Sequence, residues 1–122
     1  MRQFRVGLSA LAVVSVLILA ACSGPVFDPT GTYTGTITGV AVTLTVTSTS
    51  AANAWDLTLG YPGGTYAGGC THDPGGAANN LHCTFASGTG VLDGTLNGNT
   101  YSGTYTDTAS PASSGTFSVT RP

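Results

Sequence analysis

Lysine and glutamate are missing from this sequence of 122 residues, and charged residues make up only 7% of it. After residue 21, the charged side chains are five aspartates and Arg121, which give a side-chain charge of −4 when the histidines are neutral. Proteins that bind nucleic acid normally set several Lys or Arg side chains against phosphates. One arginine cannot do this, so we exclude nucleic acid as a partner and do not expect binding to acidic lipid headgroups.

The sequence has little that could cross a bilayer as a helix. The apolar run from Val6 to Leu19 has about 14 residues, whereas a helix needs roughly 20 to span the hydrocarbon core. Arg2 and Arg5 precede this run, and a positive segment followed by a short apolar one is typical of a secretory signal. A genuine transmembrane anchor and a signal removed by an ordinary peptidase remain the alternatives.

The residues Leu19-Ala20-Ala21-Cys22 follow the apolar run and resemble the lipobox of small bacterial lipoproteins. The resemblance implies that residues 1–21 are removed and that Cys22 carries a diacylglycerol thioether on an acylated N-terminus, with chains such as palmitate. Two or three acyl chains hold a protein firmly to a membrane. Ser23 follows the cysteine in place of the aspartate of an inner-membrane retention signal. We therefore expect an exported protein, in the outer membrane where there are two, with residues 22–29 as its tether.

From residue 30 onward, apolar and polar residues alternate with a period of two, and no window has helical spacing. We expect strands near residues 33–37, 40–46, 55–61, 66–70, 81–85, 92–96, 101–105 and 117–121. The short connections favour an antiparallel meander. The prediction is all-β, with residues 30–122 forming a single eight-stranded up-and-down barrel in which the last strand pairs with the first. A two-sheet sandwich is the alternative.

Two hairpins test this pattern. A two-residue turn at Thr38-Gly39 keeps the apolar residues of both flanking strands on one face. A type I′ turn at Asn97-Gly98 does the same, and it pairs Gly94 with Tyr101. Because glycines face large cross-strand partners in both hairpins, the strands are expected to bend strongly. This favours a closed barrel over a flat sheet.

Two cysteines remain besides Cys22. An even pair in an exported protein most often forms a disulfide. If Asp73 pairs with Asn80 across their loop, Cys70 lies directly opposite Cys83. We expect a Cys70–Cys83 disulfide, with two buried free thiols as the alternative.

No group of residues suggests catalysis. His72 and His82 point to opposite faces in the register above, so they do not converge on one metal ion. The five aspartates are scattered singly and form no acid/base pair, and no serine lies in a nucleophile elbow. We therefore expect no enzyme activity, no metal and no cofactor.

Gly31-Thr32-Tyr33 on the first strand and Arg121 on the last resemble the calycin pattern of lipocalins and avidins. In that pattern an aromatic residue opens the first strand, and a basic residue from the last strand packs across its ring. Here Tyr33 stands in the place of the family's tryptophan. The resemblance implies barrel closure through a cation–π contact between Arg121 and Tyr33.

An eight-stranded barrel is just wide enough to be filled by side chains or to hold one small ligand. Four aromatic residues are expected around the end of the barrel opposite Arg121: Tyr61, Tyr66, Phe85 and Tyr105. These rings either line a cavity for a small apolar or aromatic ligand or plug the barrel.

We therefore expect a non-catalytic, monomeric binding module that is anchored in the cell envelope. Two alternatives remain open. One is a protein-binding or inhibitory lipoprotein that acts on an envelope protein through loops such as Asp73 to Asn80. The other is a structural component of the envelope without a discrete ligand.

Overall fold

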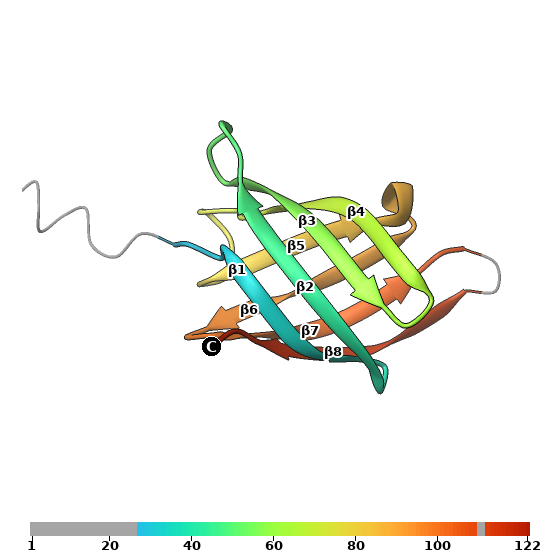
Figure 1. Cartoon of the computed structure of the whole chain (residues 1–122). Coiled ribbons are helices and arrows are strands. Elements are labelled where there is room, and N and C mark those ends of the chain that lie inside the picture. The colour runs from blue at the N-terminus through green and yellow to red at the C-terminus, as the bar shows by residue number, and fades with distance from the viewer. Residues whose placement is uncertain (1–26, 110–111) are drawn as a thin grey trace, which may run out of the picture.

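Figure 1 shows a computed structural model of the chain, which describes residues 27–109 and 112–122. Its strands are β1 (Gly31–Ile37), β2 (Val40–Ser48), β3 (Ala54–Tyr61), β4 (Gly64–Thr71), β5 (Asn80–Phe85), β6 (Gly90–Asn97), β7 (Thr100–Asp107) and β8 (Ser113–Thr120). They form a closed antiparallel barrel in chain order, and β8 pairs with β1. The predicted eight-stranded up-and-down barrel is confirmed, and the two-sheet sandwich is excluded.

Some local features differ from the prediction. A one-turn 3₁₀ helix, η1 (Ala86–Gly88), connects β5 to β6, whereas no window of the sequence had helical spacing. In addition, β8 begins at Ser113 and ends at Thr120, whereas the predicted strand covered residues 117–121. The apolar residues of β8 occupy only its second half, so the alternation could not show where the strand begins.

The alternation of residues explains which side chains are buried. In β2, Val42, Leu44 and Val46 are buried, whereas Thr43 and Thr47, which alternate with them, are exposed and Thr45 is half-buried. β-branched residues suit such a half-buried pleated surface. Because all eight strands keep one face inward, their inward side chains form a single core. The buried hydrophobic residues are Tyr33, Ile37, Val42, Leu44, Val46, Leu57, Leu59, Cys70, Leu81, Cys83, Phe85, Leu92, Leu96, Tyr101, Phe117 and Val119.

The β1–β2 hairpin has the predicted register, with Gly35 opposite Val42. Thr38 (φ 49°) and Gly39 (φ 84°) are its central residues, and both have the positive φ that a type I′ turn requires. A positive φ is unfavourable for the β-branched Thr38. Its N–H donates to the Thr116 carbonyl at 2.9 Å, which ties this turn to β8.

The predicted register of the β6–β7 hairpin is wrong. Gly94 pairs with Gly103 instead of Tyr101, and the central residues of the turn are Gly98 and Asn99. Gly98 has φ 62°, and Asn99 is not in the left-handed region. This is the arrangement of a type II′ turn, which places glycine at the first central position. The predicted turn began one residue earlier, which moves each partner by two residues and leaves the inward face unchanged.

Inward-facing glycines bring neighbouring backbones close together. A Cβ atom on Gly94 would overlap the Ser102 carbonyl, and one on Gly68 would overlap the Thr84 carbonyl. Glycine in a strand interior often marks such a close approach or a sharp bend. These residues therefore help the strands to coil into a narrow closed barrel.

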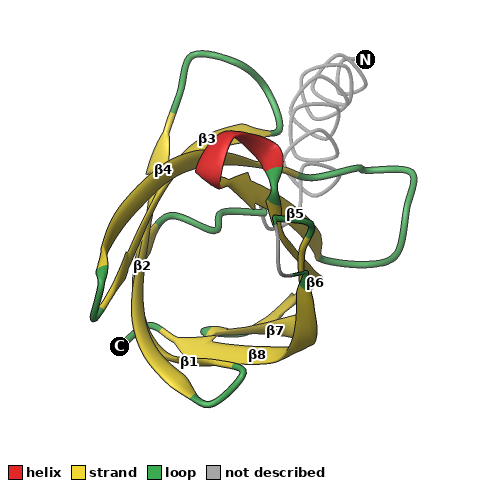
Figure 2. Cartoon of the chain, turned by 90° about the vertical axis from the view of Figure 1, so that its right-hand side faces the viewer, coloured by secondary structure: helices red, strands yellow, loops and turns green. Residues whose placement is uncertain are grey.

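The two ends of the barrel differ. We call the end that carries the β2–β3, β4–β5 and β6–β7 connections the base; both termini of the barrel lie there (Figure 1). The opposite end, which carries the β1–β2, β3–β4, β5–β6 and β7–β8 connections, is the mouth. Figure 2 views the barrel from the mouth, with η1 in front.

Candidate functional site

A cavity of about 240 Å³ opens at the mouth. Its lining comprises Ile37, Thr38, Val40, Val42, Leu59, Tyr61, Tyr66, Phe85, Tyr105, Asp107 and Ser113. The four aromatic residues predicted for this end thus line one cavity. That they bind a ligand stays a prediction.

The four rings form a row along one wall of the mouth. Their centroids are 5.2 Å apart for Tyr61 and Tyr66, 6.0 Å for Tyr66 and Phe85, and 6.2 Å for Phe85 and Tyr105. The planes of neighbouring rings lie within 30° of parallel. Phe85 packs over Gly90 of β6, where a Cβ atom would overlap its ring. The absence of a side chain at Gly90 therefore lets Phe85 reach across β6 towards Tyr105 on β7.

The hydroxyl groups of the row are fixed by local hydrogen bonds. Tyr61 donates to the Tyr66 hydroxyl at 3.0 Å, and this bond raises the pKa of Tyr61. Tyr105 donates to Oδ2 of Asp107 at 3.1 Å. Burial raises the pKa of Tyr105, with the Asp107 bond acting in the same direction and a bond from Ser113 opposing it. Tyr61 and Tyr105 are thus neutral hydrogen-bonding groups at physiological pH.

Seven residues of the lining were not among the predicted site residues: Ile37, Thr38, Val40, Val42, Leu59, Asp107 and Ser113. Asp107 follows Tyr105 by two positions, so continuing the strand alternation would have placed its carboxylate on the same inward face. Ser113 lies opposite Asp107 at the start of β8. The residues before Phe117 show no apolar alternation, so the position of Ser113 in β8 could not be predicted.

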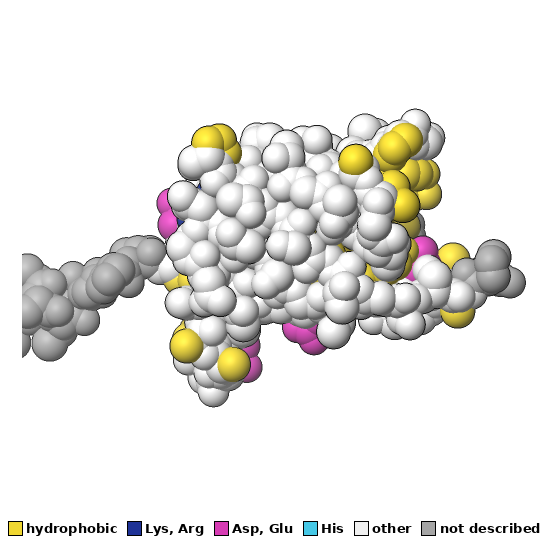
Figure 3. Space-filling model, turned by 90° about the horizontal axis from the view of Figure 1, so that it is seen from below, with side chains coloured by type: hydrophobic (Ala, Val, Ile, Leu, Met, Phe, Trp, Pro, Cys, Tyr) yellow, Lys and Arg dark blue, Asp and Glu magenta, His cyan; other side chains and the backbone are white. Residues whose placement is uncertain are grey.

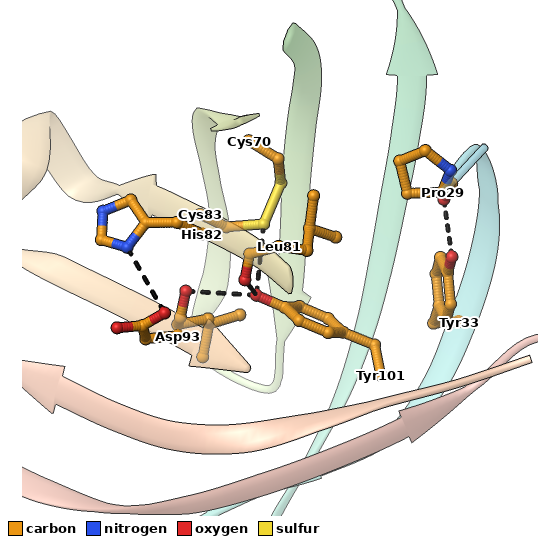
Figure 4. Close-up of a disulfide and its surroundings, with 9 residues drawn as sticks. Pro29, Tyr33, Cys70, Leu81, His82, Cys83, Asp93 and Tyr101 are labelled. Atoms are coloured by element: carbon orange, nitrogen blue, oxygen red, sulfur yellow. Dashed lines mark hydrogen bonds and ion pairs between the residues drawn. A yellow bond between two sulfur atoms is a disulfide. The ribbon is translucent and has the colours of Figure 1, made fainter. Parts of the chain in front are cut away.

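Below the mouth the barrel is filled. Tyr101 is fully buried, and its single hydroxyl hydrogen is shared between the Leu81 carbonyl at 2.7 Å and the Leu92 carbonyl at 3.1 Å (Figure 4). Burial strongly raises the pKa of Tyr101. Its hydroxyl is also 3.6 Å from Sγ of Cys83. These contacts make the interior next to the disulfide a packed core.

The predicted disulfide is present. Cys70 on β4 lies directly opposite Cys83 on β5, and their sulfur atoms are bonded (Figure 4). Both residues are buried. The bridge closes a loop with a sequence separation of 13 residues, and such a loop stabilises a fold by about 3 kcal/mol in the chain-entropy model.

Arg121 lies at the base, and its guanidinium carbon is 5.4 Å from the centroid of the Tyr33 ring. The Tyr33 hydroxyl donates to the Pro29 carbonyl at 2.6 Å. Arg121 itself donates to the carbonyls of Asp28 at 3.0 Å and Thr30 at 2.6 Å. It therefore connects the last strand to the segment that enters β1.

Arg121 also reaches the β6–β7 turn, where its Nε donates to Oδ1 of Asn99 at 3.1 Å. Because its donors face these fixed acceptors, its role is structural. Asp28 nearby accepts bonds from the Thr30 backbone N–H and hydroxyl, which lower the pKa of Asp28, with a smaller effect from Arg121.

The two histidines lie apart, as the register predicts. The His72 ring stacks on Phe27 with centroids 4.2 Å apart, and its Nδ1 lies 2.6 Å from the Asn80 carbonyl. His82 is on the outer surface of β5, with Nδ1 3.8 Å from Oδ1 of Asp93. Within the described residues, no three His, Cys, Asp or Glu side chains gather in a way that would hold a metal ion.

The predicted signal segment, residues 1–21, and the predicted lipidation site, Cys22, lie outside the described residues. Across residues 27–109 and 112–122, no helix has the length and apolar character needed to span a membrane.

No protein-family model, curated protein or solved structure matches the chain significantly. The likeness to calycins therefore rests on the eight-stranded barrel itself and on the contact between Arg121 and Tyr33. Because barrels of this kind serve many functions, the fold alone does not assign one.

Proposed function

We propose that this protein is a non-catalytic envelope lipoprotein whose barrel mouth binds a small molecule. One observation carries the proposal: an aromatic-lined cavity opens at the mouth, whereas the interior below it is filled by buried side chains. Ligand sites are commonly concave and mostly apolar, with a few fixed polar groups. The mouth has this composition, with three tyrosines, Phe85 and aliphatic residues around Asp107.

The positions of the exposed hydrophobic side chains favour the mouth over the loops as the binding site. The large hydrophobic residues exposed in the described part of the chain are Val40, at 46%, and Tyr66, at 39%, and both line the cavity. In Figure 3 hydrophobic side chains gather at the right-hand end, which is the mouth, whereas the side of the barrel shows mainly backbone and non-hydrophobic, uncharged side chains. Exposed apolar groups cost free energy in water, so a ligand that covers them would gain affinity.

The loop from Asp73 to Asn80 has a different character. The Asn80 side chain accepts a bond from the Asp73 N–H at 2.9 Å and donates to the carbonyls of Asp73 at 2.7 Å and Ala77 at 2.6 Å. The loop thus satisfies its own polar groups and presents no large apolar side chain. This disfavours the alternative of a protein-binding lipoprotein that acts through this loop.

The proposed anchor would orient the mouth away from the membrane. Phe27 packs at the base, where its ring is 5.8 Å from that of Trp55 and 4.2 Å from that of His72. Cys22 precedes Phe27 by five residues, which extend over at most about 18 Å. A lipid on Cys22 would therefore hold the base close to the bilayer and leave the mouth free to collect ligands.

Metabolic labelling with an alkyne fatty acid tests the anchor. The wild-type protein should incorporate the label and fractionate with membranes, and Cys22→Ala should lose the label. Cys70→Ala, which removes a different cysteine, should keep it. An unlabelled wild-type protein would contradict lipidation.

Thermal-shift screening tests the binding function, with the full-length gene product held in phosphatidylglycerol nanodiscs. Small amphiphilic compounds should raise the melting temperature of the wild-type protein. Tyr66→Ala should abolish these shifts because it removes the exposed ring of the row. Thr104→Ala, an exposed change on the outer face of β7, is the control. A screen without hits, or hits that Tyr66→Ala leaves unchanged, would contradict the proposal.

A further inference from the structure

The mouth carries a negative charge without a positive partner. Asp107 is the one carboxylate in the cavity lining, and no basic side chain accompanies it. Arg121, the only Lys or Arg after residue 21, is at the base, and the described His72 and His82 lie at the base and on the outer face of β5. We propose that the mouth takes a small organic cation, a substituted ammonium group on a short apolar body. This inference rests on the proposed binding function and specifies its ligand.

The carboxylate is held in place and retains capacity for a ligand. Its Oδ2 accepts the Tyr105 hydroxyl at 3.1 Å, and its Oδ1 accepts the Ala109 N–H at 2.8 Å. Both donors are neutral, so they orient the carboxylate without cancelling its charge. An ionised carboxylate has about four acceptor positions, which leaves roughly two for a further donor or a cation.

The aromatic row supplies the second element of cation recognition. The faces of aromatic rings attract cations, and this attraction strengthens when water is excluded. Tyr61 and Tyr66 are partly exposed beside the cavity, and Phe85 and Tyr105 continue the row towards the strand end that carries Asp107. A methylated ammonium in the cavity would therefore lie beside the aromatic rings while its charge faces the carboxylate.

Size and charge narrow the class of ligand. A cavity of about 240 Å³ lies below the range of roughly 300–1,000 Å³ that is typical of sites for drug-sized molecules. The part of the ligand that lies within the mouth is therefore smaller than a drug-sized molecule. An anion would be repelled by Asp107, and a neutral molecule would leave the carboxylate uncompensated once water is displaced.

Calorimetry with choline and dimethylbutanol tests the inference. The dimethylbutanol isomer is 3,3-dimethyl-1-butanol, in which a carbon atom replaces the ammonium nitrogen of choline. The two probes therefore share a shape and differ in charge. The protein is the full-length gene product in phosphatidylglycerol nanodiscs, which contain no choline. Choline should bind at least roughly fivefold more tightly than dimethylbutanol, since a cation and a carboxylate attract each other even near a solvated surface.

Asp107→Asn isolates the charge because asparagine retains an acceptor oxygen for the Ala109 N–H. It should weaken choline binding roughly fivefold or more and leave dimethylbutanol binding unchanged. Asp56→Asn makes the same chemical change at an exposed outer position of β3. It should leave the binding of both probes unchanged.

The outcomes separate the two proposals. Equal binding of both probes, or choline binding that survives Asp107→Asn, overturns the cation inference and leaves the binding function standing. If choline does not bind but neutral compounds from the thermal-shift screen bind in a Tyr66-dependent way, the cation inference is again overturned and the binding function again stands. If no compound of either kind binds, both proposals are overturned.

Discussion

Two buried tyrosines show how single residues organise the interior. Tyr33 and Tyr101 are fully buried, yet each hydroxyl finds a backbone carbonyl within 2.7 Å. A buried hydroxyl without a partner costs free energy, so these bonds make the burial of the rings favourable. The mouth tyrosines differ in that their hydroxyls are bonded mainly to other side chains near solvent. The same residue type thus fills the base and lines the opening.

Tyr101→Phe should destabilise the protein by about 1–3 kcal/mol, because it removes the buried hydrogen bond that the hydroxyl shares between the Leu81 and Leu92 carbonyls. Tyr66→Phe is the matched control: it removes an exposed hydroxyl and should change stability by about 0.5 kcal/mol or less. Urea unfolding measures both. Equal effects of the two substitutions would contradict the role assigned to Tyr101.

Alkaline pH should also destabilise the fold. Burial raises the pKa of Tyr33 and of Tyr101 above the ordinary value of about 10. A group whose pKa is raised by folding binds its proton more tightly in the folded state, so its contribution is complete below about pH 10 and is lost as the pH rises further.

The urea midpoint should therefore fall above about pH 10, and less steeply for Tyr101→Phe, which cannot ionise at this position. Phenolate absorbance should show Tyr101 ionising only as the protein unfolds. A Tyr101 phenolate that forms in the folded protein near pH 10 would contradict its burial.

At the scale of strands, the inward glycines decide how tightly neighbouring elements approach. Gly68 on β4 lies against the backbone of β5, and Gly94 on β6 lies against that of β7. Backbone atoms cannot rotate away as a side chain can. Even a methyl group at these positions would push two strands apart.

Gly68→Ala should lower the free energy of unfolding by about 3 kcal/mol or more, or prevent folding, because the added methyl group overlaps a backbone carbonyl. Gly60→Ala, in the neighbouring strand β3, is the control. Its new Cβ would be 3.7 Å from the Thr43 carbonyl oxygen, an ordinary contact. Thermal denaturation compares the two variants, and similar melting temperatures would refute the close approach of β4 and β5.

The alternation of residues was sufficient to predict the number of strands, their inward faces and the Cys70–Cys83 pairing, because a slip by a single residue would expose the core. It was not sufficient for the β6–β7 register. A shift by two residues keeps the same face inward, so hydrophobicity could not distinguish the two turns around Gly98. The four mouth aromatics could be placed at one end from strand order, but whether they line a cavity depended on packing around Gly90.

At the scale of the whole molecule, the barrel is polarised along its axis. The base contains Arg121, the entering segment and, farther in, the buried tyrosines, and the mouth contains an open aromatic cavity with one carboxylate. The predicted lipid on Cys22 would be attached to the chain close to the base. Anchoring and binding would thus occupy opposite ends, so the membrane would not obstruct the mouth.

The most direct test of this account is a map of backbone amide shifts as choline, dimethylbutanol and phenol are added in turn to the protein in phosphatidylglycerol nanodiscs. The account predicts that at least one compound shifts amides at the mouth, around residues 37–42, 61–66 and 105–109, while amides near Arg121 and in the loop from Asp73 to Asn80 stay unchanged. Shifts confined to that loop, or no shift at the mouth with any of the three compounds, would contradict it.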